Sequence, residues 1–407
     1  MVASRGPGRI VVVGASLAGW NAVRALRAEG FDGSLTLVGD EPHGPYDRPP
    51  LSKDYLAGRA DRDRLDLTAH DDVAALDVDR RVGTAAVALD VAGRTVRLAD
   101  GASLDFDGLV VATGARVRRL PGTEALSGVH ALRTVDDADA LRADLAGGPH
   151  RVVVIGAGFI GLEVAATARQ AGHDVTVVEA APTPLVRSVG ALVGTTIAEV
   201  HRGHGVGVRL GVGVAAVEGD HAVQGVRLDD GTVLAADVVV AGIGVTPATE
   251  WLASSGLTLE DGVRCDGTCL AAPGVVAAGD VASFPNALFD DEVMRVEHWD
   301  HAIAMGSFAA RRLLAGDAWD PAERFAPVPF FWSDQYDRKL QSVGRIRPDD
   351  EVVLLDGDPA EHRFVTVHVR AGRVVGAFGM NRPRHVMRLR GLIADRADLD
   401  RVRAELA

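Results

Sequence analysis

Short apolar runs alternate along the chain with longer segments in which apolar residues recur every three or four positions. Residues 10–13, 34–38 and 109–112 consist mostly of Val, Leu and Ile, which is typical of parallel strands buried on both faces. An alanine-rich segment with helical spacing follows the first run and extends to about Ala28. Strands that alternate with helices predict an α/β fold built on a parallel sheet.

The same pattern begins again near the middle of the chain. A strand is predicted at 151–155, followed by an alanine-rich helix and a second strand at 174–178. A further strand at 274–278 lies far downstream, and we expect it to return to the first sheet. The second strand–helix unit is therefore predicted to be an insertion within the first.

From about Arg324 the pattern changes. Proline and aromatic residues become frequent, and strands are predicted at 364–369 and 374–378. A helical segment that starts near Arg384 ends the chain. These residues are predicted to form a separate α+β domain.

Each of the two strand–helix units joins its first strand to its helix through a glycine-rich turn. Such a turn lets the backbone approach a pyrophosphate, whose charge then lies at the N-terminus of the helix. Two copies in this context predict two bound dinucleotides. The residues assigned to the turns are Gly14, Ser16, Leu17, Ala18 and Gly19 in the first copy, and Gly156, Gly158, Phe159, Ile160 and Gly161 in the second.

The predicted fold class is therefore α/β, with two Rossmann-like dinucleotide-binding domains, one inserted in the other, and a C-terminal α+β domain. The outer nucleotide domain is predicted to comprise residues 1–114 and 245–323. The inserted domain covers 115–244, and the C-terminal domain covers 324–407.

Ser16 replaces the middle glycine of the first turn. Its side chain would crowd the approach to the pyrophosphate, although its hydroxyl could donate a hydrogen bond to a phosphate oxygen. We expect the dinucleotide to bind in either case. Thr113, Gly114 and Gly244, in glycine turns that end two other buried strands, are assigned to the same two sites.

Acidic residues that follow the second strand of each unit are candidates to bind a ribose. Asp40 and Glu41 both stand there in the first unit, and the sequence does not decide between them. In the second unit Glu179 would accept hydrogen bonds from the ribose hydroxyls and repel a 2′-phosphate. This predicts NADH as the preferred cofactor over NADPH, although Arg187, a short way on, would tolerate the phosphate.

Charge and composition exclude several functions. The net charge of −13 argues against a nucleic-acid partner. No apolar run is long enough to cross a membrane, and cleavage of the apolar N-terminal run as a signal would remove the first glycine turn, so we expect a cytoplasmic protein. Cys265 and Cys269 are interpreted as small hydrophobes. His201 and His204 are interpreted as polar loop residues, and no metal site is assigned.

Four motifs in this order resemble the FAD-dependent ferredoxin reductases, which supply electrons to bacterial cytochromes P450 and Rieske oxygenases. The motifs are PYDRPPLSK at 45–53, GFIGLE at 158–163, AGD at 278–280 and FWSDQYD at 331–337. The resemblance covers nearly the whole chain. It implies FAD in the outer nucleotide domain, NADH in the inserted one, and a C-terminal domain that helps to dock a [2Fe–2S] ferredoxin.

The resemblance also assigns roles to single residues. Lys53 is implied to lie at the N5 and O4 edge of the flavin, paired with Glu163, where a cation favours negative charge on the ring. Trp332 is implied to lie near the flavin and the nicotinamide, and these three are the candidate catalytic residues. The other residues assigned to cofactor binding are Arg48 at the FAD adenosine and phosphates, Gly279 and Asp280 at the ribityl chain, and Glu297, His298 and Trp299 beside the ring.

Each catalytic assignment has a structural alternative. Lys53 could be a solvated loop lysine, and Glu163 could be an acid that complements the helix dipole. Trp332 is equally well explained as part of an aromatic cluster with Phe330 and Phe331 at a domain boundary.

Basic residues gather toward the C-terminus, where they would either steer an acidic ferredoxin or form a solvated surface. They are Arg338, Lys339, Arg345, Arg347, Arg363, Arg370, Arg373, Arg382, Arg384, Arg388 and Arg390.

The protein is predicted to be a monomer or weak dimer that binds no membrane. Residues 46–53 lack cysteine, which excludes thiol–disulfide chemistry as the main activity. The alternatives are an NADH-dependent reductase of rubredoxin or a quinone, and a non-catalytic, redox-sensing flavoprotein.

Overall fold

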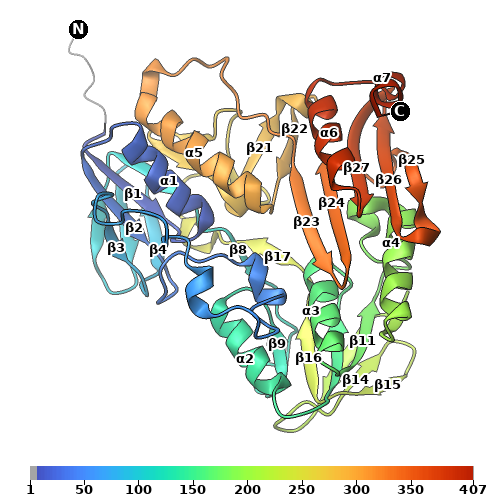
Figure 1. Cartoon of the computed structure of the whole chain (residues 1–407). Helices are drawn as coiled ribbons and strands as arrows, with labels where there is room; N and C mark the ends of the chain where they lie inside the picture. Colours follow the sequence, from blue (N-terminus) through green and yellow to red (C-terminus); the bar gives the residue numbers. More distant parts are fainter. Residues whose placement is uncertain (1–6, 407) are drawn as a thin grey trace. The chain divides into compact units, whose positions relative to one another are not determined.

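The computed structural model describes residues 7–406, apart from the side chain of Arg187. The chain forms two compact units, and each unit is assembled from three separate segments. Unit 1 contains the chain up to Asp47, Leu65–Arg116 and Thr246–Pro329. Unit 2 contains Arg48–Arg64, Val117–Val245 and the chain from Phe330 onward. Strands β8 (Ala115–Val117) and β17 (Val245–Pro247) lie where the chain passes between units (Figure 1).

Unit 1 is built on a six-stranded sheet whose central strands are parallel. Its order is β19 (Leu270–Ala272), β20 (Val275–Ala277), β7 (Gly108–Val111), β1 (Arg9–Val13), β2 (Ser34–Val38) and β3 (Asp79–Arg81). Val12 of β1 is fully buried and lies opposite Leu37 on one side and Val110 on the other. Because β20 pairs in parallel with β7, the expected return of the chain to the first sheet is confirmed.

Two helices of unit 1, α1 (Leu17–Ala28) and α5 (Trp299–Ala315), pack closely against each other. A Cβ atom at Gly306 of α5 would lie 2.3 Å from the carbonyl oxygen of Ala18, so only glycine allows this approach. Unit 1 also contains two small sheets that the sequence pattern did not predict. These are β4 (Ala86–Asp90), β5 (Thr95–Leu98) and β6 (Ser103–Asp105), and β18 (Val263–Arg264), β21 (Ala282–Asn286) and β22 (Glu292–Arg295).

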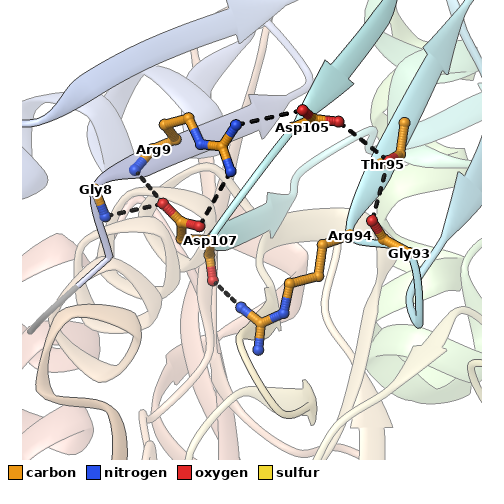
Figure 2. Close-up of polar contacts among 7 residues, drawn as sticks. All are labelled: Gly8, Arg9, Gly93, Arg94, Thr95, Asp105 and Asp107. Atoms are coloured by element: carbon orange, nitrogen blue, oxygen red, sulfur yellow. Dashed lines mark hydrogen bonds and ion pairs between the residues drawn. The ribbon is translucent and has the colours of Figure 1, made fainter. Parts of the chain in front are cut away.

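An arginine and an aspartate join the start of β1 to the start of β7 (Figure 2). The carboxylate of Asp107, just before β7, accepts hydrogen bonds from the backbone N–H groups of Gly8 and Arg9 at 3.1 and 2.9 Å. The guanidinium of Arg9 bonds the same carboxylate and reaches Asp105 at 3.3 Å. Arg94 donates to the backbone oxygen of Asp107 at 2.8 Å. We call the Arg9–Asp107 pair the first Arg–Asp clasp.

Unit 2 contains a second parallel sheet with its own helices. The strand order is β12 (Gly207–Leu210), β11 (Asp174–Glu179), β10 (Arg151–Ile155), β16 (Val238–Ala241) and β9 (Val129–Ala131). The helices are α2 (Val135–Leu145), α3 (Phe159–Gln170) and α4 (Val186–Gly203), and a small antiparallel sheet is formed by β13 (Val214–Glu218), β14 (Gly225–Leu228) and β15 (Val233–Ala235). The two predicted nucleotide folds are therefore both present.

The same clasp recurs in this second sheet. Arg151, the first residue of β10, pairs with Asp237, the residue just before β16. Asp237 also accepts the backbone N–H of Arg151 at 2.8 Å. The side-chain hydrogen bond from Arg151 lowers the pKa of Asp237 to about 2. We call this pair the second Arg–Asp clasp, and it occupies the same place in its fold as the first.

The C-terminal part of unit 2 is an antiparallel sheet covered by helices, as the sequence predicted. The strand order is β23 (Phe330–Gln335), β24 (Arg338–Gly344), β27 (Arg373–Met380), β26 (Arg363–Arg370) and β25 (Glu351–Asp358). Helix α6 (Pro383–Ala394) lies against this sheet and is followed by α7 (Leu399–Leu406). The fold class predicted from the sequence is confirmed. Within the described range, every helix is too short or too polar to traverse a lipid bilayer.

Four of the described histidines are buried, and burial lowers the pKa of each, most strongly in His201, His301 and His368. The pKa is about 4 for His201, about 3 for His301 and about 4 for His368. His301 is packed between Phe284 and Phe325, with ring centroids 5.4 Å away in each case. Neither of its ring nitrogens has a hydrogen-bond partner among the described residues.

These values predict a loss of stability in acid. In the unfolded chain these three histidines bind protons near pH 6.5, whereas in the folded protein they bind them only near pH 3 to 4. The free energy of unfolding therefore has its full value above pH 6.5. It falls as the pH drops toward 4, by about 1.4 kcal/mol per pH unit for each histidine. His301→Leu should make this pH dependence shallower in urea-unfolding curves. His70→Gln, at an exposed position of the same unit, is the control. An unchanged slope in His301→Leu would contradict the prediction.

Candidate functional site

The first glycine turn requires glycine at two positions. Gly14 has a φ of 122°, and a Cβ atom there would lie 2.0 Å from the carbonyl oxygen of Ala112. A Cβ at Gly19 would lie 1.9 Å from the oxygen of Gly14. Ser16 has a φ of −127°, an extended conformation that any residue adopts. The replacement of the middle glycine by Ser16 therefore causes no backbone strain.

The helices that follow the two glycine turns have open N-termini. In α1 and α3 no side chain caps the helix, and the first turn contains no acidic residue. Helix α2 is different, because Thr134 and Asp137 form a reciprocal capping box. The free N–H groups of α1 and α3 and the positive ends of their dipoles fit a pyrophosphate at each turn.

Unit 1 brings three helical starts together beside the first turn. Gly279 belongs to a short 3₁₀ helix, η4 (Gly279–Val281), and a Cβ there would lie 2.9 Å from Cβ of Ala18 and 3.8 Å from Cβ of Ala302 in α5. Asp280 stands in the first turn of η4, and its backbone oxygen accepts from Arg295. The predicted FAD residues Ala18, Gly279 and Asp280 therefore gather at one place.

The three residues predicted beside the flavin ring lie at the start of α5. Glu297 forms an ion pair with Arg295, and His298 is the N-cap residue. Trp299 begins the helix, and its indole N–H donates to Asp47 at 2.7 Å. This bond ties the start of α5 to Asp47, the third residue of the PYDRPPLSK motif.

The two candidate ribose acids of unit 1 differ in their surroundings. Asp40 is largely exposed and lies 3.6 Å from Arg116. Glu41 accepts a hydrogen bond from the hydroxyl of Tyr46. Thr113 and Gly114 follow β7, where the Thr113 hydroxyl donates to the backbone oxygen of Ala248 at 2.8 Å.

The second glycine turn has space for a ligand. Gly156 has a φ of 98°, and a Cβ there would lie 2.4 Å from the oxygen of Gly242. By contrast, a Cβ at Gly158 would have only one atom within 4 Å, at 3.9 Å, and Gly244 faces open space. Glu179 lies at the end of β11, where its carboxylate accepts from the backbone N–H groups of Ala157 and Ala181, both at 2.8 Å.

The remaining residues predicted at this turn have distinct environments. Phe159 begins α3, and its ring lies edge-on to Phe331 with centroids 4.3 Å apart. Ile160 is about half exposed. The backbone of Arg187 belongs to α4, but its side chain lies outside the described part of the structure.

Lys53 and Glu163 form an ion pair within unit 2. The ammonium of Lys53 lies 2.7 Å from Oε2 of Glu163, and the glutamate side chain is only 2% exposed. Glu163 lies on the buried face of α3, and Lys53 ends a 3₁₀ helix, η1 (Pro49–Ser52), whose two prolines stiffen it. A buried carboxylate needs such a partner. Neither structural alternative, a solvated lysine or a helix-dipole acid, describes this geometry.

Three residues around this pair were missed by the sequence analysis. Ser52 donates to Oε2 of Glu163, and Ser333 of β23 donates to Oε1 at 2.6 Å. Thr167, one turn after Glu163, donates to the backbone oxygen of Ser52 at 2.8 Å. The available signal was an acid within an apolar, alanine-rich helix, which must find polar partners if it is buried.

The aromatic segment of β23 is divided between the two faces of the strand. Trp332 stacks on Phe330, with centroids 6.0 Å apart, whereas Phe331 contacts Phe159. Alternation along a strand explains why these rings do not form one cluster. Arg48 is also in unit 2, and its guanidinium donates to the backbone oxygen of Arg133 at 2.7 Å.

The interpretation of His201 as a loop residue was wrong. Helix α4 continues through Gly203, and the His201 side chain is completely buried. His204 is exposed, and it caps the same helix as its C-terminal flanking residue. The two cysteines are buried and free, as expected for small hydrophobes.

Comparisons with known proteins agree with this geometry. Residues 8–306 match the family described as pyridine nucleotide-disulphide oxidoreductase, and residues 330–405 match the reductase C-terminal family. The chain is 38% identical to rhodocoxin reductase of Rhodococcus erythropolis, over 95% of this chain and 89% of that protein. It is 40% identical to the ferredoxin–NAD(+) reductase component of the anthranilate 1,2-dioxygenase system of Burkholderia cepacia, over 94% of this chain and 93% of that protein.

A solved structure with a similar fold is the covalent complex of putidaredoxin reductase with putidaredoxin. Its TM-score to this chain is 0.90 at 36% sequence identity, and the match covers 96% of this chain and 93% of that one. An NAD-dependent persulfide reductase from A. fulgidus shares the fold at 23% identity. The chain belongs to the pyridine nucleotide-disulphide oxidoreductase family and, within it, to the FAD-dependent NADH:ferredoxin reductases with a C-terminal reductase domain.

Proposed function

We propose that this protein passes electrons from NADH through FAD to a [2Fe–2S] ferredoxin that serves a cytochrome P450 or Rieske-type oxygenase. The observation that carries the proposal is the C-terminal segment 330–405, which matches the reductase C-terminal family and supplies Ser333 to the carboxylate of Glu163. The names of the relatives, reductase components of dioxygenase systems and putidaredoxin reductase, support the same conclusion.

The two glycine turns would hold the two cofactors. FAD would bind at the α1 turn, together with Gly279, Asp280 and the start of α5, and NADH would bind at the α3 turn with Glu179. When bound, the flavin accepts the hydride of NADH and releases electrons one at a time. Lys53 supplies a fixed positive charge that is held by Glu163, and we assign it to the flavin edge by the family resemblance. Trp332 is proposed to border the same site.

Thiol chemistry does not fit the described residues. Residues 46–53 contain no cysteine. Cys265 and Cys269 are buried, and burial raises the pKa of Cys265 to about 12, so neither thiol forms a reactive thiolate near neutral pH. With no reactive thiol among the described residues, a bound flavin would pass its electrons to an external acceptor without a thiol intermediate.

The partner is proposed to be an acidic ferredoxin, and the protein is proposed to act as a monomer or weak dimer in the cytoplasm. Several of the C-terminal basic residues already pair with acids in the fold. These pairs are Arg338–Asp337, Lys339–Asp334, Arg370–Asp350, Arg382–Asp356 and Arg388–Glu405. The acids of these pairs offset the positive charge of this region, so electrostatic steering is expected to be modest.

The proposed reaction predicts a specific dependence on ferredoxin. Anaerobic NADH should bleach the purified yellow protein, and NADH-driven cytochrome c reduction should rise strongly when a [2Fe–2S] ferredoxin is added. This turnover should fall as salt increases, whereas direct ferricyanide reduction should not follow the same trend. Faster turnover with rubredoxin or a quinone than with any ferredoxin would favour the alternative reductases. Little turnover with every acceptor would favour a redox sensor.

Removal of the Lys53 charge should slow the reduction of the flavin. Lys53→Met keeps most of the side-chain volume and leaves Glu163 without its cation, and we expect flavin reduction by NADH to slow by about a hundredfold. Stopped-flow absorbance measures this rate, and fluorescence titration measures FAD affinity, which should change much less. Arg59→Met, at an exposed position of the same segment, is the matched control. Unchanged reduction kinetics in Lys53→Met would remove Lys53 from the catalytic residues.

Glu179 should determine the choice of nicotinamide cofactor. Its carboxylate is fixed by two backbone N–H groups at the second turn, so it would repel a 2′-phosphate. We expect kcat/KM for NADH to exceed that for NADPH by about tenfold or more. Glu179→Gln should lower this ratio of the two kcat/KM values. Asp174→Asn, at the exposed start of the same strand, should leave it unchanged. Equal kinetics with both cofactors in the unmodified protein would refute the assignment.

A further inference from the structure

A chain of side-chain hydrogen bonds within unit 2 ends on the carboxylate of Glu163. Ser333 lies 2.6 Å from Oε1 of Glu163, and Nε2 of Gln335 lies 3.0 Å from Oγ of Ser333. Oε1 of Gln335 is 2.9 Å from Nε2 of His201. Nδ1 of His201 is 3.3 Å from the hydroxyl of Tyr336. We call these four residues, Ser333, Gln335, His201 and Tyr336, the Glu163 support chain.

The chemistry of each group fixes the direction of donation. The amide oxygen of Gln335 can only accept, so Nε2 of His201 carries the hydrogen. The neutral ring then has Nδ1 as an acceptor, and the hydroxyl of Tyr336 donates to it. Gln335 donates through its amide nitrogen to Ser333, which in turn donates to Glu163. Every donor therefore points toward the carboxylate.

Burial keeps this chain neutral. Ser333, Gln335 and His201 are all buried. Desolvation lowers the pKa of His201 to about 4 and raises the pKa of Tyr336, so both are uncharged at pH 7. A line of neutral dipoles with the same direction stabilises a negative charge at the end that they point to.

The outer end of the chain is held in a strained conformation. Tyr336 lies in the two-residue turn between β23 and β24 with a φ of 56°, which is unfavourable for a bulky side chain. Its ring stacks on His204, with centroids 3.7 Å apart and planes 6° apart. The strain is consistent with a requirement for the hydroxyl at His201.

Gln335, in the middle of the support chain, decides between two possible roles of the chain: transfer of a proton and positioning of Glu163. An amide does not exchange protons readily, so the support chain is a poor path for moving a proton between His201 and Ser333. Its four residues instead orient a hydrogen-bond acceptor, the carboxylate of Glu163. The role that remains is to stabilise and position the carboxylate.

We propose that Gln335 and His201 are positioning residues, which act through Ser333 to hold the Glu163 carboxylate in place and directed at Lys53. This inference rests on the proposed function only in assigning the Lys53–Glu163 pair to the reaction. The arrangement of the support chain itself can be tested in the resting protein, without NADH.

The direction of donation is tested by ¹⁵N NMR of histidine-labelled holoprotein, with His201→Gln to assign the signals. We expect His201 at pH 7 to be the tautomer with the hydrogen on Nε2. A hydrogen on Nδ1 would reverse the chain at this residue and overturn the proposal.

The effect on Glu163 is tested by ¹³C NMR of glutamate-labelled holoprotein, with Glu163→Gln to assign its signal. His201→Leu removes the donor, and Gln335→Glu draws the Ser333 hydrogen away from Glu163. Both should move the ¹³C carboxyl signal of Glu163 at pH 7, and Gln335→Glu should move it further than His201→Leu. His201→Gln keeps an N–H at the same position and should restore behaviour close to that of the unmodified protein. Tyr336→Phe, a milder change, should give a smaller shift in the same direction.

His173→Gln is the matched control, because His173 is a buried histidine of the same unit that bonds the backbone of His150 and not the support chain. If folded His201→Leu, Gln335→Glu and Tyr336→Phe all give the same Glu163 carboxyl signal as the unmodified protein, the proposal fails. A shifted Glu163 signal together with normal flavin reduction would instead keep the positioning role and contradict the proposed catalytic role of the pair.

Discussion

A buried carboxylate must be compensated, and much of unit 2 is arranged around Glu163. Its side chain is 2% exposed, so its charge survives only if cations and donors surround it. The partners come from all three segments that form the unit: Lys53 and Ser52 from the first, the helix of Glu163 itself from the second, and Ser333 from the third. One charged group thereby requires three distant parts of the chain to meet.

The sequence was informative where the physical rule is local. Gly14 and Gly156 have a positive φ and lie beside a backbone carbonyl, so no other residue fits there. The glycine turns can therefore be predicted from the sequence. The apolar strand before each turn was predicted from its local run of apolar residues, and the return of the chain at β20 was predicted from the position of a further such run far downstream. The Lys53–Glu163 pair was reached only through the family resemblance, because the two residues are 110 positions apart.

The sequence was least informative where function depends on burial. His201 stands near glycines and next to charged residues, which suggested a loop, yet it lies on the inner face of α4 and bonds Gln335, 134 positions away. Ser333 and Gln335 alternate with Trp332 and Asp334 on β23, a pattern that fits either an exposed or a buried polar face. Tertiary packing, and not local propensity, decides between the two.

The two Arg–Asp clasps, Arg9–Asp107 and Arg151–Asp237, show that the two nucleotide folds share more than their glycine turns. In each fold an aspartate just before one strand, β7 or β16, binds the first residue of the neighbouring parallel strand, β1 or β10. In both folds the clasp links the starts of two paired strands, at the end of the sheet away from the glycine turn.

The assembly of unit 2 from three segments has a consequence for synthesis of the chain. Glu163 and Lys53 leave the ribosome long before Ser333, so in the nascent second nucleotide fold the Glu163 carboxylate lacks one of its hydrogen-bond donors until β23 has been translated. Maturation of this half must therefore wait for the end of translation, and a product that stops short of β23 would expose the partly assembled fold to proteases and chaperones.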